Sequence, residues 1–452
     1  MFQLLLILVL LTIAAPAWAA CGGASPNLTA PTWDDVAACH TAAVNGDTIT
    51  VTPGSYTTTA TLAITKYVKI IGTSVTVTDN SAAGDPDAGG GPSLITITES
   101  TAGSTTIQGF VFQQGTGVHR GKAGIIEMNF VVGGRPILIT GNTFTQDNSG
   151  NAMVAHTNRG VIWNNTFTGV PRGGGCLNNT SAMRHKPTSL GSSWSTPSSF
   201  GMADTTGTGN LYFEKNTLTN MMEGIDSDDN ARTVVRYNTF RNSSLTLHGT
   251  DTSGLYGARY VEMYNNTLVV DQTPQATCGG LPPQPAVGFN IRGGTMLVHD
   301  NVIPDNSTPT WGTKVAVTFS LENLRRNAGG FPCWSTVTAL AAGYPVPHQA
   351  GWGFTTGATT VTGSNCASCP VHQDIEPIYL WNNTGAGNYN SPAIADYSPN
   401  ECGVGAPSAG PYIQSGRDYF TSTAKPGYTP YQYPHPLTGD TVPGAPAGLT
   451  VR

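Results

Sequence analysis

The feature that most limits the possible folds of this chain is a short phrase, Asn-Thr-Phe or a close variant, that recurs along its 452 residues. In unbroken stretches the phrase returns after 23, 22 and 28 residues, from 142 to 165, from 216 to 238 and from 238 to 266. An alternation of β-branched or aromatic residues, such as Thr233-Val234-Val235-Arg236, typically precedes it. Short strands at a nearly constant spacing predict a β-solenoid. The asparagines of the phrase are Asn142, Asn165, Asn216, Asn238, Asn266, Asn301 and Asn383.

The recurring asparagine has a structural explanation. A coil of about 22 residues cannot bury its own apolar side, whereas coils stacked at the ~4.8 Å strand spacing share one continuous core. Asparagines at the same corner of successive coils can stack, and each side-chain amide then hydrogen-bonds to the next along the axis. We therefore predict an asparagine ladder and assign these residues a structural rather than a catalytic role.

The composition excludes some classes of partner. Only 11% of the residues are charged and the formal net charge is −6, while 39% are hydrophobic, which argues against extensive disorder. No basic tract is present that could neutralise a row of phosphates, and no apolar run beyond residue 20 approaches the ~20 residues of a membrane-spanning helix. We therefore expect neither nucleic acid nor, after removal of a signal segment, a membrane span.

The N-terminus and the cysteines indicate a secreted protein. Residues 2–13 are apolar, and Ala17-Trp18-Ala19 has the small-x-small pattern of a signal cleavage site, so we predict a signal peptide over residues 1–19. The even number of cysteines beyond this site predicts up to four disulfides in an oxidising compartment, with the pairing left open. These candidate disulfide cysteines are Cys21, Cys39, Cys176, Cys278, Cys333, Cys366, Cys369 and Cys402.

The region after the signal segment predicts a cap for the solenoid. Thr32 and Asp35 have the spacing of a capping box that opens a short amphipathic helix ending near Val44. Strands are expected over 48–52, 62–64 and 68–71. Such a cap would protect the open end of the solenoid against end-to-end association.

Together, residues 33–72 (WDDVAACH… to …YVKIIG) and the following Asn-Thr-Phe coils resemble the secreted bacterial right-handed parallel β-helix proteins of the pectate-lyase-like superfamily. The resemblance implies an all-β solenoid over residues 20–402, with the N-terminal capping helix and two long inserted loops, at 171–209 and 325–375. We further expect residues 403–438, rich in Pro, Gly and Tyr, to wrap the last coils, and residues 439–452 to be a linker. The resemblance identifies a fold and no single enzyme family.

Charged residues are scarce, so their concentration between residues 214 and 262 is informative. The repeat places Glu214, Arg236, Tyr264 and His299 each two residues before its repeat asparagine, so they are expected to line up on one face of the solenoid. Glu214 and Tyr264, together with Tyr256, are therefore candidate substrate-binding residues. The alternative is that the charges form solvated turns whose ion pairs have little energetic weight.

A lyase that cleaves a uronic-acid polymer needs a cation to neutralise the sugar carboxylate, a base for the C5 proton and an acid near the leaving oxygen. Asp226, Asp228 and Asp229 offer hard oxygen ligands for a possible Ca²⁺. The remaining candidates are Arg236 or Arg259 as uronate ligand or base, His248 and Tyr256 for proton transfer, and Asp251, which with the other aspartates could also supply the carboxylate pair of a glycoside hydrolase.

Two functions therefore remain open. The first is a secreted carbohydrate-active enzyme that acts on an extracellular polysaccharide, most plausibly a polysaccharide lyase and alternatively a glycoside hydrolase. The second is a non-catalytic extracellular protein, structural, adhesive or self-associating into a fibre. Because this fold hosts many functions, the distinguishing observation is whether the candidate residues converge on one face.

Overall fold

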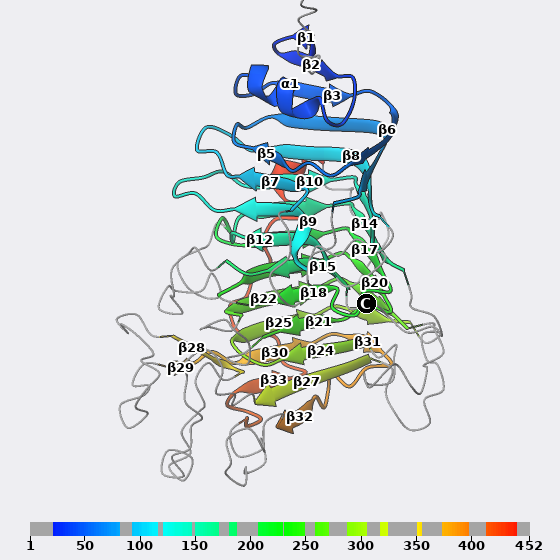
Figure 1. The fold of residues 1–452 in the computed structure, drawn as a ribbon. Helices are drawn as coiled ribbons and strands as arrows, with labels where there is room; N and C mark the ends of the chain where they lie inside the picture. Colours follow the sequence, from blue (N-terminus) through cyan, green and yellow to red (C-terminus); the bar gives the residue numbers. More distant parts are fainter. Residues whose placement is uncertain are drawn as a thin grey trace, which may run out of the picture.

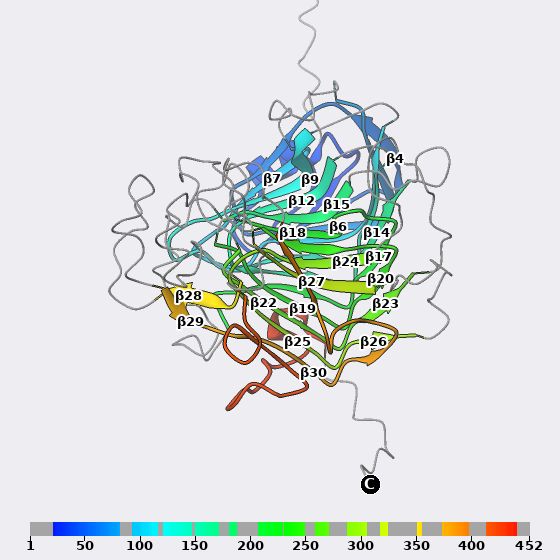
Figure 2. The same ribbon diagram turned by 90° about the horizontal axis from the view of Figure 1, so that it is seen from below.

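The computed structural model describes residues 21–81, 93–115, 121–146, 150–170, 180–187, 207–228, 230–248, 258–270, 287–304, 317–323, 350–354, 373–396 and 413–440. These residues form a parallel β-helix in which successive coils stack along one axis (Figure 1). Figure 2, seen from below, shows the strands grouped on separate sides around a shared interior. The predicted all-β solenoid is confirmed.

One side of the solenoid is a ten-stranded parallel sheet, which we call sheet B. Its strands are β5 (Leu62–Ile64), β7 (Ile95–Thr98), β9 (Gly121–Asn129), β12 (Gly150–His156), β15 (Thr180–His185), β18 (Ile225–Ser227), β21 (Leu245–Leu247), β24 (Val287–Ile291), β27 (Val317–Asn323) and β32 (Ala393–Asp396).

The other strands of the coils form a second, larger sheet with two faces. Face A1 carries the strand that follows sheet B in each coil: β2 (Asn27–Ala30), β3 (Thr48–Val51), β10 (Ile137–Thr140), β13 (Gly160–Trp163), β16 (Leu211–Glu214), β19 (Arg232–Arg236), β22 (Tyr260–Tyr264), β25 (Thr295–His299), β30 (Ile378–Trp381) and β33 (Tyr419–Thr421). Face A2 carries β4 (Gly54–Thr58), β11 (Thr143–Gln146), β14 (Thr166–Gly169), β17 (Thr217–Thr219), β20 (Thr239–Arg241), β23 (Thr267–Val269), β26 (Val302–Ile303) and β31 (Thr384–Gly385). The long strands β6 (Lys69–Asp79) and β8 (Thr106–Gln114) run through both faces.

The interior is filled by side chains that repeat from coil to coil. From Asn142 to Asn301, the residue two positions after each ladder asparagine points inward. The rings of Phe144 and Phe167 stack there with centroids 5.0 Å apart, and Phe112 of the preceding coil stacks on Phe144 at 5.4 Å. Leu218 and Phe240 continue this row, fully buried. Parallel pairing in constant register therefore turns a sequence repeat into a continuous apolar column.

The predicted asparagine ladder is present along the corner between faces A1 and A2. In Asn238, Nδ2 donates to Oδ1 of Asn266 at 2.9 Å and to the carbonyl oxygen of Phe213 at 2.9 Å. Its Oδ1 accepts from the backbone N–H and the Nδ2 of Asn216. The same pattern runs from Asn142 to Asn383, and each of these asparagines is buried.

We expect Asn238→Ala to lower the free energy of unfolding by about 2–4 kcal/mol, because the carbonyl of Phe213 and the backbone N–H of Asn216 would lose the buried side-chain amide that they contact. Denaturant unfolding measures this change. Asn390→Ala, at an exposed asparagine, is the control and should change it by less than about 0.5 kcal/mol. Equal losses in the two variants would contradict a ladder that stabilises the corner.

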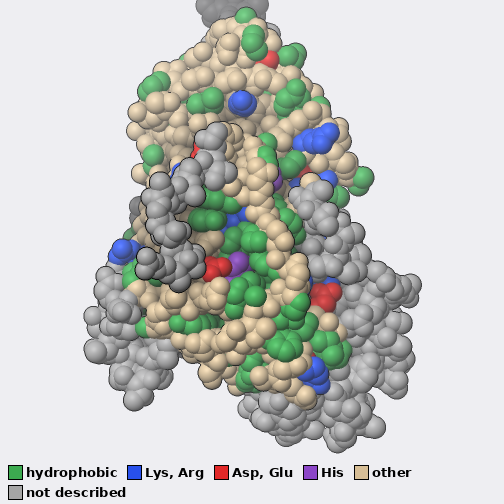
Figure 3. Space-filling view, turned by 180° about the vertical axis from the view of Figure 1, so that it is seen from behind, with side chains coloured by type: hydrophobic (Ala, Val, Ile, Leu, Met, Phe, Trp, Pro, Cys, Tyr) green, Lys and Arg blue, Asp and Glu red, His purple; other side chains and the backbone are tan. Residues whose placement is uncertain are grey.

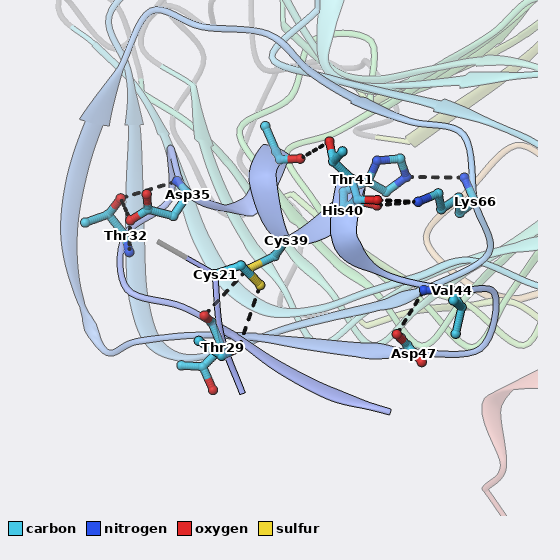
Figure 4. The surroundings of a disulfide bond; sticks show 12 residues. Cys21, Thr29, Thr32, Asp35, Cys39, His40, Thr41, Val44, Asp47 and Lys66 are labelled. Atoms are coloured by element: carbon cyan, nitrogen blue, oxygen red, sulfur yellow. Dashed lines mark hydrogen bonds between the residues drawn. A yellow bond between two sulfur atoms is a disulfide. The ribbon is translucent and has the colours of Figure 1, made fainter. Parts of the chain in front are cut away.

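The N-terminal end is closed by the predicted cap (Figure 4). Thr32 Oγ1 donates to Asp35 Oδ2 at 2.7 Å, and helix α1 (Val36–Ala42) follows, so the capping box closes the turn just before the helix. Lys66 Nζ donates to the carbonyls of three residues at the C-terminus of α1, at 2.7–2.9 Å. Cys21 and Cys39 form a disulfide that links α1 to the segment entering β1 (Gly22–Ala24), which pairs antiparallel with β2.

The outcome of the other predictions depends on which residues are described. Within the described residues α1 is the only α-helix, and its seven residues are too few to span a bilayer. The stretch 171–209, expected to be one inserted loop, contains strand β15 of sheet B. In the second expected insertion, β28 (Trp352–Phe354) and β29 (Gln373–Ile375) form an antiparallel pair. The signal segment, the linker after 440 and the other six cysteines lie outside the described residues.

The C-terminal segment, residues 413–440, returns along face A1. After β33 it passes Trp381 and Tyr264, where Tyr428 and Tyr433 lie, and its short 3₁₀-helix η3 (Pro436–Thr438) contacts β10 and β13. The face opposite to the view of Figure 1 shows hydrophobic side chains gathered along its middle, with a few charged groups among them (Figure 3). The sequence predicted that the C-terminal segment wraps the last coils. In the structure it also contacts earlier coils, as far as β10 and β13.

Candidate functional site

The outer side of sheet B carries a group of ionisable side chains that several successive coils bring together. Inward residues such as Met183, Ile225 and Leu245 pair in register in the core, so the residues between and beyond them face outward. We call the resulting group the sheet B strip. It comprises Arg184, Lys186, Glu223, Asp226, Asp228, His248, Arg292 and Glu322.

Asp226 is the centre of the strip. It is 4% exposed, and its Oδ1 lies 2.8 Å from Nε2 of His248, which belongs to the next coil. Its Oδ2 lies 3.6 Å from Nε of Arg184, on the preceding coil. Burial raises the pKa of Asp226, but His248, Arg184 and Lys186 together lower it, and the net pKa is below its ordinary value. Asp226 therefore stays ionised between two cationic or proton-carrying neighbours.

Glu223 has the opposite electrostatic environment. It precedes β18 in the turn that leads into sheet B, near Asp226. Burial and the negative charge of Asp226 raise its pKa, and His248, Arg184 and Arg292 only partly offset this effect. Glu223 and Asp226 are therefore two neighbouring carboxyls whose pKa values are driven apart, an arrangement that separates a proton donor from an ionised group.

Further ion pairs extend the strip along the axis. Lys186 Nζ lies 3.4 Å from Asp228 Oδ2, and Arg292 Nε lies 3.0 Å from Glu322 Oε2. Lys186 keeps 18% of its side chain exposed and Arg292 keeps 19%. Partly exposed cations above buried carboxylates give the outer surface of sheet B groups that can contact an anionic ligand.

The predicted alignment of Glu214, Arg236, Tyr264 and His299 is confirmed, but on face A1. Strand pairing places Glu214 opposite Arg236, Arg236 opposite Tyr264, and Tyr264 opposite His299. The row continues to Trp381, on which the His299 ring stacks with centroids 4.1 Å apart. We call these five residues the covered strip.

The covered strip is held beneath the C-terminal segment. Arg236 is fully buried, donates to Glu214 Oε1 at 2.8 and 2.5 Å, and also donates to the carbonyls of Tyr431 and Gln432 at 2.7 and 2.6 Å. The other carboxylate oxygen of Glu214 accepts from the backbone N–H of His435. Arg236 and Glu214 thus hold the C-terminal segment against face A1. This structural role explains why the two charged residues are buried there.

Glu262 lies under the same segment and gives it a pH dependence. Tyr428 Oη donates to Glu262 Oε2 at 2.7 Å, and burial raises the pKa of this carboxyl to about 7. The unfolded chain releases this proton near pH 4.5. The stabilising contribution of the proton is therefore fully present below about pH 4.5 and is lost as the pH rises through about 7.

We expect Glu262→Gln to remove this dependence and to stabilise the protein at pH 8 by up to about 3 kcal/mol relative to the native chain. The measurement is the difference in free energy of unfolding between variant and native protein at several pH values, since other carboxyls cancel in that difference. A difference that stays constant between about pH 4.5 and 8 would show that Glu262 ionises equally in both states.

Arg259 lies apart from both strips. It precedes β22, its side chain is fully buried, and its Nη1 and Nη2 form a bidentate pair with the carboxylate of Glu376 at 2.7 and 2.8 Å. This pair joins coils 117 residues apart in sequence. Asp229, Asp251 and Tyr256 lie outside the described residues, so their proposed roles stay predictions.

The calcium expectation also stays a prediction. Among the described residues no group of three or more His, Cys, Asp or Glu side chains has the arrangement of a metal site. The two described members of the predicted site each contact protein cations, Asp226 through Arg184 and His248 and Asp228 through Lys186. The sheet B strip thus contains protein cations beside the two aspartates that were predicted to bind Ca²⁺.

Of the predicted site residues, Asp226, Asp228 and His248 converge on sheet B, whereas Glu214, Arg236 and Tyr264 lie on face A1. Sequence reasoning missed five members of the site, namely Arg184, Lys186, Glu223, Arg292 and Glu322. The alternation Met183-Arg184-His185-Lys186, with charged residues at every second position, was a usable signal for the first two.

Comparisons with known proteins add little to this description. No protein-family model matches the chain, and no curated protein matches its sequence. Among solved structures, the chain is similar to a mutant of a PL6 family alginate lyase, at 12% identity and a TM-score of 0.19. The match covers 65% of this chain and 53% of the lyase, so the chain spans about half the length of that protein. A TM-score this low leaves the function to be argued from the site.

Proposed function

We propose that this chain is a secreted carbohydrate-active enzyme, specifically a polysaccharide lyase that cleaves a uronic-acid-containing polymer at the sheet B strip. The observation that carries the proposal is the buried pair of Asp226 and His248, 2.8 Å apart, with the cations Arg184 and Lys186 on the preceding coil. These are the residue types that β-elimination next to a carboxylate requires.

In the proposed reaction, His248 removes the C5 proton of the uronate. The carboxylate of Asp226, whose Oδ1 lies 2.8 Å from Nε2 of His248, favours a proton on Nε2 and so leaves Nδ1 as the nitrogen that takes up the C5 proton. Arg184 and Lys186 neutralise the sugar carboxylate, whose negative charge increases as the proton leaves. The C4–O bond then breaks, and the departing oxygen takes a proton from Glu223, whose raised pKa favours its protonated form.

The pairing of Glu223 and Asp226 favours a second candidate, a glycoside hydrolase. A protonated carboxylic acid beside an ionised carboxylate is the arrangement such enzymes use, with the acid protonating the leaving oxygen. The two reactions differ in their products, because elimination leaves a C4=C5 double bond whereas hydrolysis adds water.

The test incubates the mature protein, with and without Ca²⁺, with pectate, alginate, chondroitin sulfate, hyaluronan and neutral xylan. Ultraviolet absorbance of the unsaturated product and the number of new reducing ends are followed together. Growth of both signals is the expected result. Reducing ends without absorbance would establish the hydrolase, and silence in both signals would favour the structural, adhesive or fibre-forming role. Dependence on added Ca²⁺ would support the predicted metal site.

A further inference from the structure

A cavity of about 640 Å³ opens at the corner where sheet B turns into face A1. Its walls come from the turns of successive coils: residues 130–136 between β9 and β10, 158–159 between β12 and β13, 208–209 before β16, and 230–232 between β18 and β19. This volume lies within the ~300–1,000 Å³ typical of small-molecule sites. Coil stacking, rather than any single loop, therefore forms the cavity.

The cavity has a strongly positive lining. The described residues around it include Arg135, Arg159 and Arg232 and no carboxylate. Arg135 is exposed, whereas Arg232 is 8% exposed. Arg159 is held in place, because its Nη2 donates to Glu99 Oε2 at 2.8 Å and its guanidinium lies 4.7 Å from the centroid of the Phe130 ring. Three guanidinium groups around one hollow favour an anionic ligand.

A hydrogen-bond acceptor accompanies these cations. Asn230 is 4% exposed and lines the cavity, and its buried Oδ1 has no hydrogen-bond partner among the described residues. Asn158 fixes this wall, since its Nδ2 donates to the carbonyl of Asn230 and its Oδ1 accepts from the N–H of Arg232. A buried acceptor without a partner is costly, and a hydroxyl group in the cavity would satisfy it.

The cavity is continuous in sequence with the sheet B strip. Asn230, which lines the cavity, follows Asp228 of the strip by two residues. The cavity therefore adjoins the strip at Asp228.

We propose that this cavity binds an acidic sugar residue, with the arginines contacting its carboxylate or sulfate and Asn230 Oδ1 accepting from one of its hydroxyls. The inference rests on the proposed polysaccharide function and deepens it, because it requires the substrate to carry an anionic group beside the cleaved linkage. Neutral glycans lack the group that the three arginines select.

Isothermal titration of the full chain tests this with a hexuronate trisaccharide, a sulfated disaccharide and neutral xylotriose. We expect the acidic sugars to bind and xylotriose not to bind. Arg135→Ala and Asn230→Asp should each weaken the binding at least about tenfold, the second because it adds a negative charge with almost no change of shape. Arg241→Ala, at an exposed arginine on face A2, is the matched control and should bind like the native chain.

Each outcome bears on the cavity separately from catalysis. Weakened binding in both cavity variants supports the inference even if no polymer is cleaved, in which case only the proposed reaction fails. Which acidic sugar binds distinguishes carboxylate from sulfate recognition. Equal affinity of the cavity variants and the native chain, absence of binding by any acidic sugar, or equal binding of xylotriose would overturn the inference.

Discussion

Replacing Arg236 with methionine is expected to destabilise the protein by about 3–5 kcal/mol, because the change leaves the carboxyl of Glu214 buried without its cation. Burial lowers the pKa of Arg236, but Tyr264 and Glu214 raise it well above its ordinary value, so the native guanidinium is always charged. Its contacts to the carbonyls of Tyr431 and Gln432 would be lost as well. Denaturant unfolding measures the stability, and limited proteolysis measures release of the C-terminal segment.

Two companion variants separate the possible causes of such a loss. The double variant Glu214→Gln with Arg236→Met leaves no unpaired charge and should recover part of the stability, while the segment should stay sensitive to protease because its anchor is still absent. Arg241→Ala removes an exposed arginine five residues away and should change stability by less than about 0.5 kcal/mol. An Arg236→Met variant within about 1 kcal/mol of the native protein would mean that the pair does not anchor the segment.

The ladder corner was predictable because its signal is local. Each ladder asparagine follows a residue in the left-handed conformation, with φ between 50° and 65° from Gly141 to Asn382. Glycine, asparagine and aspartate tolerate this conformation and occupy most of these positions, whereas Lys215 and Tyr237 are strained there. Most coils repeat this conformation and the inward apolar residue that follows it, so the period and the core were predictable from the sequence alone.

The site was only partly predictable, because proximity in sequence does not identify a face. A coil of about 22 residues passes through all three sides of the solenoid, so the charges between 214 and 262 divide between sheet B and face A1. Asp226 and Arg236 are ten residues apart and still belong to different faces. The repeat predicted which residues share a row, but not that a segment 195 residues later covers one of those rows.

The sequence repeat could not predict ion pairs between residues that are separated by an inserted segment. Arg184 pairs with Asp226, which lies 42 residues later in the sequence, and Arg259 pairs with Glu376, 117 residues later. The lengths of the segments between coils vary, and no periodic count predicts them. The pairing of Cys21 with Cys39 was open for the same reason, since it depends on how α1 lies over β2.

We expect His248→Gln to reduce the rate of β-elimination by about 10²–10⁴-fold, because glutamine still places an N–H donor beside Asp226 but cannot take up the C5 proton. The loss should fall on kcat with little change in KM, since the proposed cations that bind the uronate, Arg184 and Lys186, are untouched. Asp226→Asn should have a smaller effect and should shift the acidic limb of the pH–rate profile. Absorbance of the unsaturated product measures the rate.

His299→Gln is the matched control for this prediction. His299 is also a buried histidine beside an aspartate, with Nδ1 2.7 Å from Asp300 Oδ2, but it lies on face A1 in the covered strip. A general loss of packing would lower the activity of both histidine variants together, whereas a role in proton transfer lowers it only for His248. Full elimination activity in a folded His248→Gln protein would remove His248 as the base and leave Lys186, the partly exposed cation paired with Asp228, as the next group to replace.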